Sequence, residues 1–178
     1  MLNLLLKSFW FMLPAGFANM APVLFKWLPF LGTPIDLNRK YRGKPIFGSH
    51  KTYRGFLVGV VFATLIVWFQ MHFYEYTATI SIIDYKRVNI VLLGFLFGFG
   101  ALFGDLIKSF FKRRLNIISG ISWPPFDQID WIIGSLCLVS FYITIPWKIL
   151  LTIFILFGLL HPIVNLIGYY MKIKKEKL

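Results

Sequence analysis

The sequence is poor in acidic residues and has almost no cysteine. Only seven Asp and Glu accompany 19 Lys and Arg, and Cys137, the one cysteine, lies inside an apolar run where it gives no support for a disulfide framework or a cysteine zinc site. Charged residues of all kinds make up 15% of the chain, hydrophobic residues make up 58%, and the mean hydropathy is +0.72. This balance excludes an ordinary soluble globular domain, so we expect an integral membrane protein.

Long apolar stretches recur along the whole chain and predict its architecture. Each of five is long enough to cross the hydrocarbon core of a bilayer as a helix: residues 2–31, 56–73, 88–106, 126–145 and 149–170. Pro14, Gly16, Asn19 and Pro22 interrupt the first stretch, which we interpret as one tilted, broken crossing or as two half helices. The prediction is an all-α integral membrane protein of one domain, residues 1–178, with about five transmembrane helices in a cell membrane.

The basic residues indicate how these helices are oriented. Six lie in residues 38–54, four in residues 108–128 and four after Tyr170, whereas Lys7, Lys86, Arg87 and Lys148 fall on the opposite side and Lys26 lies within the first crossing. Basic residues favour the cytoplasmic side of a membrane. We therefore expect the N-terminus outside, the C-terminus inside and two long cytoplasmic loops, residues 32–55 and 108–126. Because the positive charge follows this topology, nucleic-acid binding is not expected.

The first long loop has features of an anion site. Residues 48–55 read GSHKTYRG, where glycines allow tight backbone turns and Thr52 stands between Lys51 and Arg54 just before a predicted helix. A hydroxyl and two cations at a helix start suit a phosphate, although the spacing is not that of a Walker loop. The alternative is that these charges only fix the topology of the loop.

The second loop and its approach hold three of the seven acidic residues: Asp105, Asp127 and Asp130. On helices, Asp105 shares a face with Ser109 and with Lys112 or Arg113, and Asp127 shares a face with Asp130. A carboxylate facing lipid costs about 2.5–3.5 kcal/mol, so these side chains should point into the bundle or a wet cavity. Either basic side chains (Lys108, Lys112, Arg113, Arg114) neutralise them or a metal does; for all three together we favour Mg²⁺, which prefers such hard oxygen ligands.

These motifs carry a family resemblance. GDLIKSFFKRR followed by PPFDQID is similar to the signature of membrane CTP:phosphatidate cytidylyltransferases. The first loop, GTPIDLNRKYRGKPIFGSHKTYRG, and PAGFANMAP near the N-terminus resemble the archaeal branch of that family, the CDP-archaeol synthases. Together the similar segments extend over nearly the whole chain.

The resemblance implies a five-helix bundle with a polar, lipid-accessible cavity on its cytoplasmic side. It implies Mg²⁺-dependent transfer of CMP from CTP to a lipid phosphate, the unsaturated archaetidic acid digeranylgeranylglyceryl phosphate, which yields CDP-archaeol and pyrophosphate. Carried over, Asp105 and Asp127 are metal ligands, with Asp130 assisting them as a further ligand or orienting a neighbour. The catalytic set is then Asp127, Asp130, Lys112 and Arg113, and the residues near CTP or lipid phosphate are Ser49, Lys51, Thr52, Arg54 and Ser109.

Some alternatives stay open at the level of sequence. Bacterial-type enzymes have a Lys-Asp pair and a glycine-rich approach before the last motif, where this chain has Ile118, Ser119 and Trp123; that disfavours, without excluding, a CDP-diacylglycerol synthase acting on phosphatidic acid. The alternative class of function is a small transporter or a non-catalytic membrane subunit. Whether the chain forms a homodimer is left open by the sequence. Asn19, beside the prolines of the first crossing, is a further candidate to touch substrate. Glycines 94, 98, 100 and 104 more simply permit close helix contact.

Overall fold

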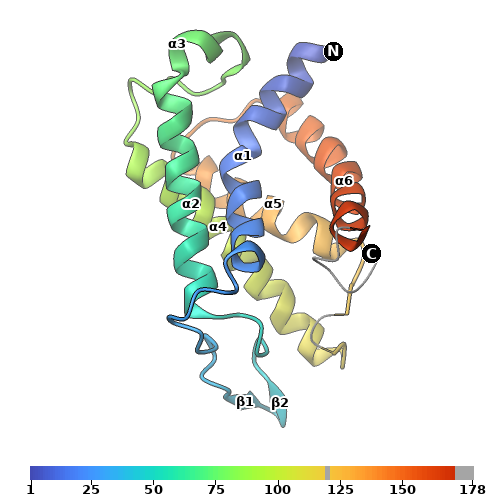
Figure 1. Cartoon of the computed structure of the whole chain (residues 1–178). Coiled ribbons are helices and arrows are strands. Elements are labelled where there is room, and N and C mark those ends of the chain that lie inside the picture. Colours follow the sequence, from blue (N-terminus) through green and yellow to red (C-terminus); the bar gives the residue numbers. More distant parts are fainter. Residues whose placement is uncertain (119–120, 171–178) are drawn as a thin grey trace.

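A computed structural model of the chain shows a bundle of long helices with a small β-hairpin at one end (Figure 1). It describes residues 1–118 and 121–170, with only some of the side chains from residue 161 onward. The elements of the described part are α1 (Leu2–Leu24), β1 (Lys40–Tyr41), β2 (Lys44–Pro45), α2 (Tyr53–His72), α3 (Tyr74–Thr77), η1 (Ala78–Ile80), α4 (Ile90–Arg114), α5 (Phe126–Ser140) and α6 (Trp147–Tyr170). The expected all-α class holds apart from the two-residue strands.

The first helix corrects one expectation. α1 runs unbroken through Pro14 and Pro22 and ends at Leu24, so neither a broken crossing to residue 31 nor two half helices is right. Proline removes one backbone hydrogen bond, but helices packed inside a membrane bundle tolerate this because neighbouring groups cover the freed carbonyl. Pro14 is itself buried in the bundle.

The remaining helices differ from expectation mainly at their ends. α2 begins three residues early because Thr52 caps it: Thr52 Oγ1 accepts a hydrogen bond from the Gly55 N–H at 3.2 Å. α4 continues to Arg114, past the apolar crossing expected to end at residue 106, so Asp105, Ser109 and Lys112 lie on one helix as expected; its basic last turn is what the helix dipole favours. α5 ends at Ser140 instead of residue 145, where β-branched residues 143–145 precede Pro146.

Three helices, α1, α2 and α4, are long and apolar enough to cross a membrane. α5 has 15 residues, which at 1.5 Å per residue gives only about 22 Å. In α6 the apolar stretch is Trp147–Leu160. The chain is therefore a multi-pass membrane protein built of helices.

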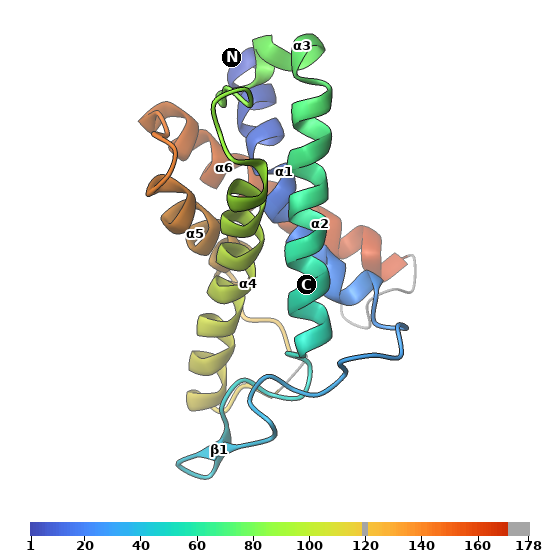
Figure 2. The ribbon, with the colours of Figure 1, turned by 90° about the vertical axis from the view of Figure 1, so that its left-hand side faces the viewer.

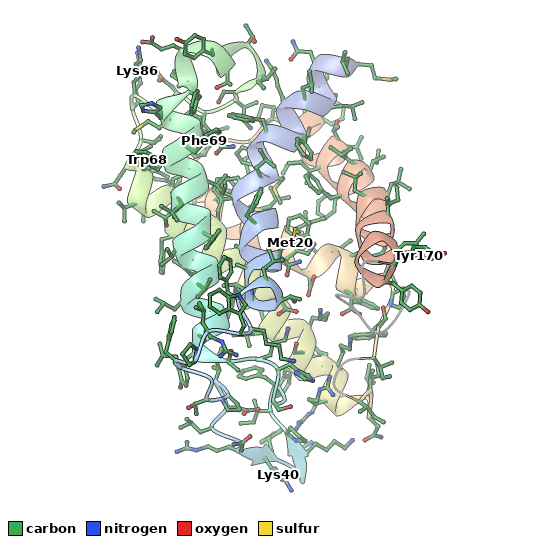
Figure 3. The ribbon with its side chains drawn as sticks, viewed as in Figure 1. Met20, Lys40, Trp68, Phe69, Lys86 and Tyr170 are labelled. Carbon is green, nitrogen blue, oxygen red and sulfur yellow. The ribbon has the colours of Figure 1, made fainter. Side chains whose placement is uncertain are left out.

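The bundle has a common core and two chemically different ends. Fully buried side chains from α1, α4, α5 and α6, such as Phe11, Phe97, Ile132 and Ile153, meet between the helices. The hairpin and the basic end of α4 lie at one end of the bundle, and α3 lies at the other (Figures 1 and 2). Lys40 and Lys86 mark these opposite ends in Figure 3.

Glycines bring α4 and α5 into backbone contact. A Cβ at Gly104 would lie 2.2 Å from the Asp130 carbonyl oxygen, and one at Gly134 would lie 2.2 Å from the Gly100 carbonyl oxygen. The expectation that these glycines serve close helix contact is confirmed. In Figure 2, α4 has α2 on one side and α5 on the other. The close approach places Asp105 of α4 beside the start of α5.

The hairpin is fastened to the end of α4. Its turn residues, Arg42 and Gly43, have φ of 51° and 76°, as a tight two-residue hairpin turn requires. The Arg114 guanidinium donates hydrogen bonds to the carbonyl oxygens of Tyr41 at 2.6 Å and Lys44 at 3.3 Å, and Lys44 Nζ donates to the Arg114 carbonyl at 3.0 Å. The first long loop and α4 thus form one connected unit.

Candidate active site

The three predicted carboxylates meet around one lysine. Lys108 Nζ lies 2.6 Å from Asp127 Oδ1, 2.7 Å from Asp130 Oδ2 and 2.9 Å from Asp105 Oδ1. The exposed fraction of these four side chains is between 6% and 15%. We call Asp105, Asp127, Asp130 and Lys108 the acidic cluster. Carboxylates from two helices are thereby gathered at one buried point.

Asp127 is the most heavily contacted carboxylate of the cluster. Besides Lys108, it faces Lys112 Nζ at 3.2 Å and accepts hydrogen bonds from the Trp123 N–H and the Ser122 hydroxyl. Lys112 also donates to the Ile121 carbonyl, so it fixes the segment that leads into α5. Asp130 accepts a hydrogen bond from the Trp131 N–H at 2.8 Å. The orientation of both carboxylates is set before any ligand arrives.

The first loop reaches the cluster through one side chain. Lys51 Nζ pairs with Asp105 Oδ2, opposite the oxygen that faces Lys108. The backbone places Lys51 there, because the Ile35 N–H donates to the Lys51 carbonyl at 2.7 Å and the Lys51 N–H to the Gly48 carbonyl at 3.2 Å. Side chains from the first long loop and from α4 and α5 therefore meet at one point.

The cluster in this structure is an ion-pair network. Within residues 1–118 and 121–170, no three His, Cys, Asp or Glu side chains have the arrangement of a metal site. The point shared by the three carboxylates holds the Lys108 ammonium. Pairing with basic side chains was one of the two alternatives left by the sequence. These side chains would still suit Mg²⁺, because carboxylates are hard oxygen ligands and all three reach one cationic centre.

A cavity of about 480 Å³ lies between the first loop and the end of α4. Its lining residues are mostly polar or basic, and they include Lys40, Lys44, Gly48, Ser49 and Arg113. The four residues of the acidic cluster are not part of its described lining; the two are linked through the chain, since Ser49 is two residues before Lys51 and Arg113 follows Lys112. Arg113 is buried, and its Nε has no hydrogen-bond partner in the described part of the chain. A buried guanidinium with an unused donor favours an anionic occupant.

Asp36 holds the wall of this cavity in shape. Its carboxylate accepts hydrogen bonds from the N–H groups of Asn38, Phe47 and Gly48 at 2.9–3.0 Å. Burial alone would raise the pKa of Asp36, but the donors from Gly48, Phe47 and Asn38 outweigh burial and hold that pKa below its ordinary value. An ionised Asp36 therefore fixes the residues on both sides of the hairpin.

The other predicted site residues have mixed outcomes. Thr52 caps α2, and Arg54 Nη1 donates to the Leu28 carbonyl, so both hold the loop in place in this structure. Ser109 is buried on α4, one turn after Asp105. Asn19 is half-buried in α1 and takes no part in the ion pairs of the cluster. Contact of these four residues with substrate stays a prediction.

Sequence reasoning missed two residues of the site. Lys108 appeared only as one of several basic partners, whereas it stands at the centre of the cluster; its position three residues after Asp105 on the same helix was the available signal. Asp36 was missed because its partners are backbone N–H groups up to 12 residues away, which no residue pattern reveals. Ser119 lies outside the described residues, as does the lysine-rich tail from residue 171.

Comparison with known proteins finds similar chains over nearly the full length of this one. A family model, CarS-like CDP-archaeol synthase, matches residues 1–177. The chain is 40% identical to the CDP-archaeol synthase of Pyrococcus furiosus over 171 residues, covering 96% of both chains. It is 35% identical to that of Methanocaldococcus jannaschii over 174 residues, covering 97% of this chain and 96% of the relative.

A solved structure is similar in fold as well. It is described as an intramembrane enzyme for archaeal membrane lipids biosynthesis, and it superposes with a TM-score of 0.70 at 26% sequence identity. The alignment covers 89% of this chain and 92% of that chain. The likeness therefore extends over almost the whole bundle.

Proposed function

The chain belongs to the CDP-archaeol synthase family, and from that premise we propose that it transfers CMP from CTP to unsaturated archaetidic acid at the acidic cluster. In this reaction an oxygen of the lipid phosphate forms a bond to the α-phosphorus of CTP. The bond from that phosphorus to the β-phosphate oxygen breaks, and pyrophosphate leaves. The products are CDP-archaeol, with its unsaturated chains, and pyrophosphate.

One observation supports the place of this chemistry: Asp105, Asp127 and Asp130 converge on a single cationic point at the basic end of the bundle. Phosphoryl and nucleotidyl transfer need little covalent help from a protein and depend on positioning and charge. Buried carboxylates surrounded by Lys51, Lys108 and Lys112 meet that need, because the cations attract phosphates and the carboxylates attract a metal.

Mg²⁺ is the cofactor we propose, with Asp105, Asp127 and Asp130 as its protein ligands and the nucleotide phosphates as further ligands. When bound, it offsets negative charge on the departing pyrophosphate. The residues of the chain fix the geometry around it. Asp127 is held by the Trp123 N–H and Asp130 by the Trp131 N–H, so each carboxylate keeps its direction when the ion pairs rearrange.

We propose that the 480 Å³ cavity receives the nucleotide. Two anionic substrates repel each other, and the cations that line this cavity reduce that repulsion. Arg113 donates its unused Nε–H to a phosphate oxygen, and Lys40 and Lys44 neutralise the outer phosphates. Lys51, which pairs with Asp105 and lies two residues after the cavity-lining Ser49, guides the phosphate chain toward the cluster. Thr52 and Arg54 hold Lys51 in position through the start of α2.

We also propose five membrane crossings, by α1, α2, α4, α5 and α6, with the hairpin end in the cytoplasm. The ten basic residues in residues 38–54 and 108–128 support this orientation, because only Lys7, Lys86, Arg87 and Lys148 fall on the opposite side of the membrane in this scheme. The cytoplasm supplies CTP to that end. The lipid substrate reaches the cluster from the bilayer.

Product identification tests the proposed function. The purified protein is incubated with CTP, Mg²⁺ and equal amounts of the ether lipid phosphate and phosphatidic acid, and the products are identified by mass spectrometry. We expect the CDP-linked ether lipid with its unsaturated chains. A preference for the acyl lipid would replace the proposed substrate, and no CDP-lipid from any lipid phosphate would refute the proposed function.

A further inference from the structure

Lys108 has a position in the cluster that no other cation shares. Its ammonium contacts all three carboxylates at 2.6–2.9 Å, whereas Lys51 contacts Asp105 and Lys112 contacts Asp127. Its side chain is 12% exposed, so water screens these contacts little. Lys108 occupies the point from which one cation reaches all three carboxylates.

The formal charges of this network cancel. Three carboxylates face three ammonium groups, those of Lys51, Lys108 and Lys112. A divalent ion that enters alone must displace Lys108 from the carboxylates and brings two uncompensated positive charges into a buried site. Such charge is costly at low dielectric unless an anion accompanies it. The triphosphate of CTP is such an anion.

We propose that Lys108 is a resident counter-ion which prevents tight binding of a free divalent ion and makes metal binding depend on CTP. This inference rests on the proposed function, in which the three carboxylates are the metal ligands. Without nucleotide, the protein keeps its three carboxylates together around the Lys108 ammonium. The metal and the nucleotide then enter as a pair, and the displaced ammonium lies beside the incoming phosphates.

The test uses the full-length protein in detergent and Mn²⁺ as the probe, with free Mn²⁺ measured by electron paramagnetic resonance in the absence of CTP. We expect weak binding by the wild type. Lys108→Met removes the competing charge, and its Mn²⁺ affinity should rise on the order of tenfold or more. Lys108→Gln is a second variant in case the first does not fold, as judged by gel filtration.

Lys112→Met is the matched control, because it removes the same charge from the same network and leaves Lys108 in place. The Mn²⁺ affinity of Lys112→Met should change by less than about threefold. Lys86→Met, at the opposite end of the bundle, is a second control and should bind Mn²⁺ as the wild type does. Adding Asp127→Asn to Lys108→Met should abolish the gain, which locates the ion at the cluster. In the wild type, CTP together with Mn²⁺ should raise the melting temperature more than either does alone.

The outcomes separate this inference from the proposed function. If the wild type and Lys108→Met bind Mn²⁺ with equal affinity, and both lose this binding when Asp127→Asn is added, the role of Lys108 is refuted. The metal site of the proposed function would then remain. An equal gain in Lys112→Met would also refute it, because the effect would then reflect net charge alone. If no protein binds Mn²⁺ with or without CTP, the metal site of the proposed function fails and this inference fails with it.

Discussion

Asp127 is the residue on which the proposed site depends most strongly. It joins Lys108, Lys112 and the backbone before α5. Asp127→Asn keeps the shape and a hydrogen-bond acceptor but removes the charge, so we expect kcat/KM to fall by at least about 10²-fold. The measurement is CDP-lipid formation from labelled CTP by purified variants.

Asp84→Asn is the control for Asp127→Asn, because Asp84 pairs with Arg87 in the loop before α4. It should keep wild-type turnover. Normal melting of both variants would show that they fold. Turnover of Asp127→Asn close to that of the wild type would remove Asp127 from the reaction.

Lys51 should act on nucleotide binding more than on the chemical step. Its side chain is 27% exposed and pairs with Asp105, and Lys51 lies two residues after Ser49, which lines the cavity. Lys51→Ala removes a cation from the path of the phosphates, so we expect a higher KM for CTP with a smaller change in kcat. Steady-state kinetics with each substrate varied in turn measures both.

Lys86→Ala provides a comparison for Lys51→Ala. Its ammonium lies 3.8 Å from Glu75 at the opposite end of the bundle and is 70% exposed. Its KM for CTP should equal that of the wild type. If Lys51→Ala leaves KM unchanged for both CTP and the lipid phosphate, the cationic border of the cavity has no part in nucleotide binding.

The predictability of the site differs from residue to residue. Asp105, Asp127 and Asp130 could be grouped from the sequence, because carboxylates are costly in a membrane bundle and must gather where a cation meets them. The central place of Lys108 could not be read in the same way, because its spacing brings it within a turn of Asp105 but does not show that the same ammonium also reaches Asp127 and Asp130 on another helix. Only the packing of α4 against α5 decides which of them reaches all three carboxylates.

At the scale of elements, the contact between α4 and α5 should be the most sensitive to a small change. Gly104→Ala would place a methyl group 2.2 Å from the Asp130 carbonyl oxygen, which belongs to the backbone and cannot rotate away. We expect the helices to separate, a loss of about 1–3 kcal/mol in the free energy of unfolding and a loss of activity. Thermal melting in detergent and the transfer assay measure these effects.

Gly158→Ala is the control for Gly104→Ala, since a Cβ there meets nothing within 4 Å. It also lies in a long apolar helix, α6, so both substitutions change helix propensity alike. We expect it to melt at or above the wild-type temperature, because alanine is the better helix former. Equal melting and equal activity of the two variants would contradict the close packing of α4 on α5.

The first loop should depend on the charge of Asp36. Asp36→Asn weakens three hydrogen bonds from backbone N–H groups, and a hydrogen bond to a charged group contributes about 1.5–3 kcal/mol. We expect faster hydrogen–deuterium exchange at Phe47 and Gly48, measured by mass spectrometry of peptides spanning the loop. Asp84→Asn should leave exchange in these peptides unchanged, and unchanged exchange in Asp36→Asn would contradict the role of Asp36.

Acid should weaken the same hydrogen bonds of the first loop, and the pKa of Asp36 gives the direction of this pH dependence. The pKa of Asp36 is lower in the folded protein than in the unfolded chain, so its contribution is fully present above the unfolded value. It is lost as the pH falls through the lower, folded-state pKa. Protection of Phe47 and Gly48 should therefore persist at neutral and mildly acidic pH and disappear only at a pH below 3.8, the ordinary value.

The sequence predicted the positions of the lipid-facing helices better than the ends and the continuity of individual helices. Apolar stretches indicated α2 and α4 because a helix that faces lipid must be apolar along its whole length. The end of α4 was not predictable from hydropathy, since Lys112, Arg113 and Arg114 are polar and yet helical. The continuity of α1 through Pro14 was equally hidden, because it depends on the helices that pack around it.

At the scale of the whole molecule, the asymmetry of charge predicts an orientation that labelling can test. In a Cys137→Ser background, Lys40→Cys places a thiol on the hairpin and Lys86→Cys places one at the opposite end of the bundle (Figure 3). An impermeant maleimide should label Lys86→Cys in intact cells and Lys40→Cys only after the membrane is opened. The reverse pattern would invert the topology and place the cavity outside.

The hydrogen bonds between Arg114 and the hairpin have a consequence for product release. Because the helix that carries Asp105 also binds the hairpin backbone at Tyr41 and Lys44, we expect α4 and the hairpin to move together. The nucleotide-linked lipid would then leave sideways, between helices and into the bilayer, without the hairpin detaching from α4.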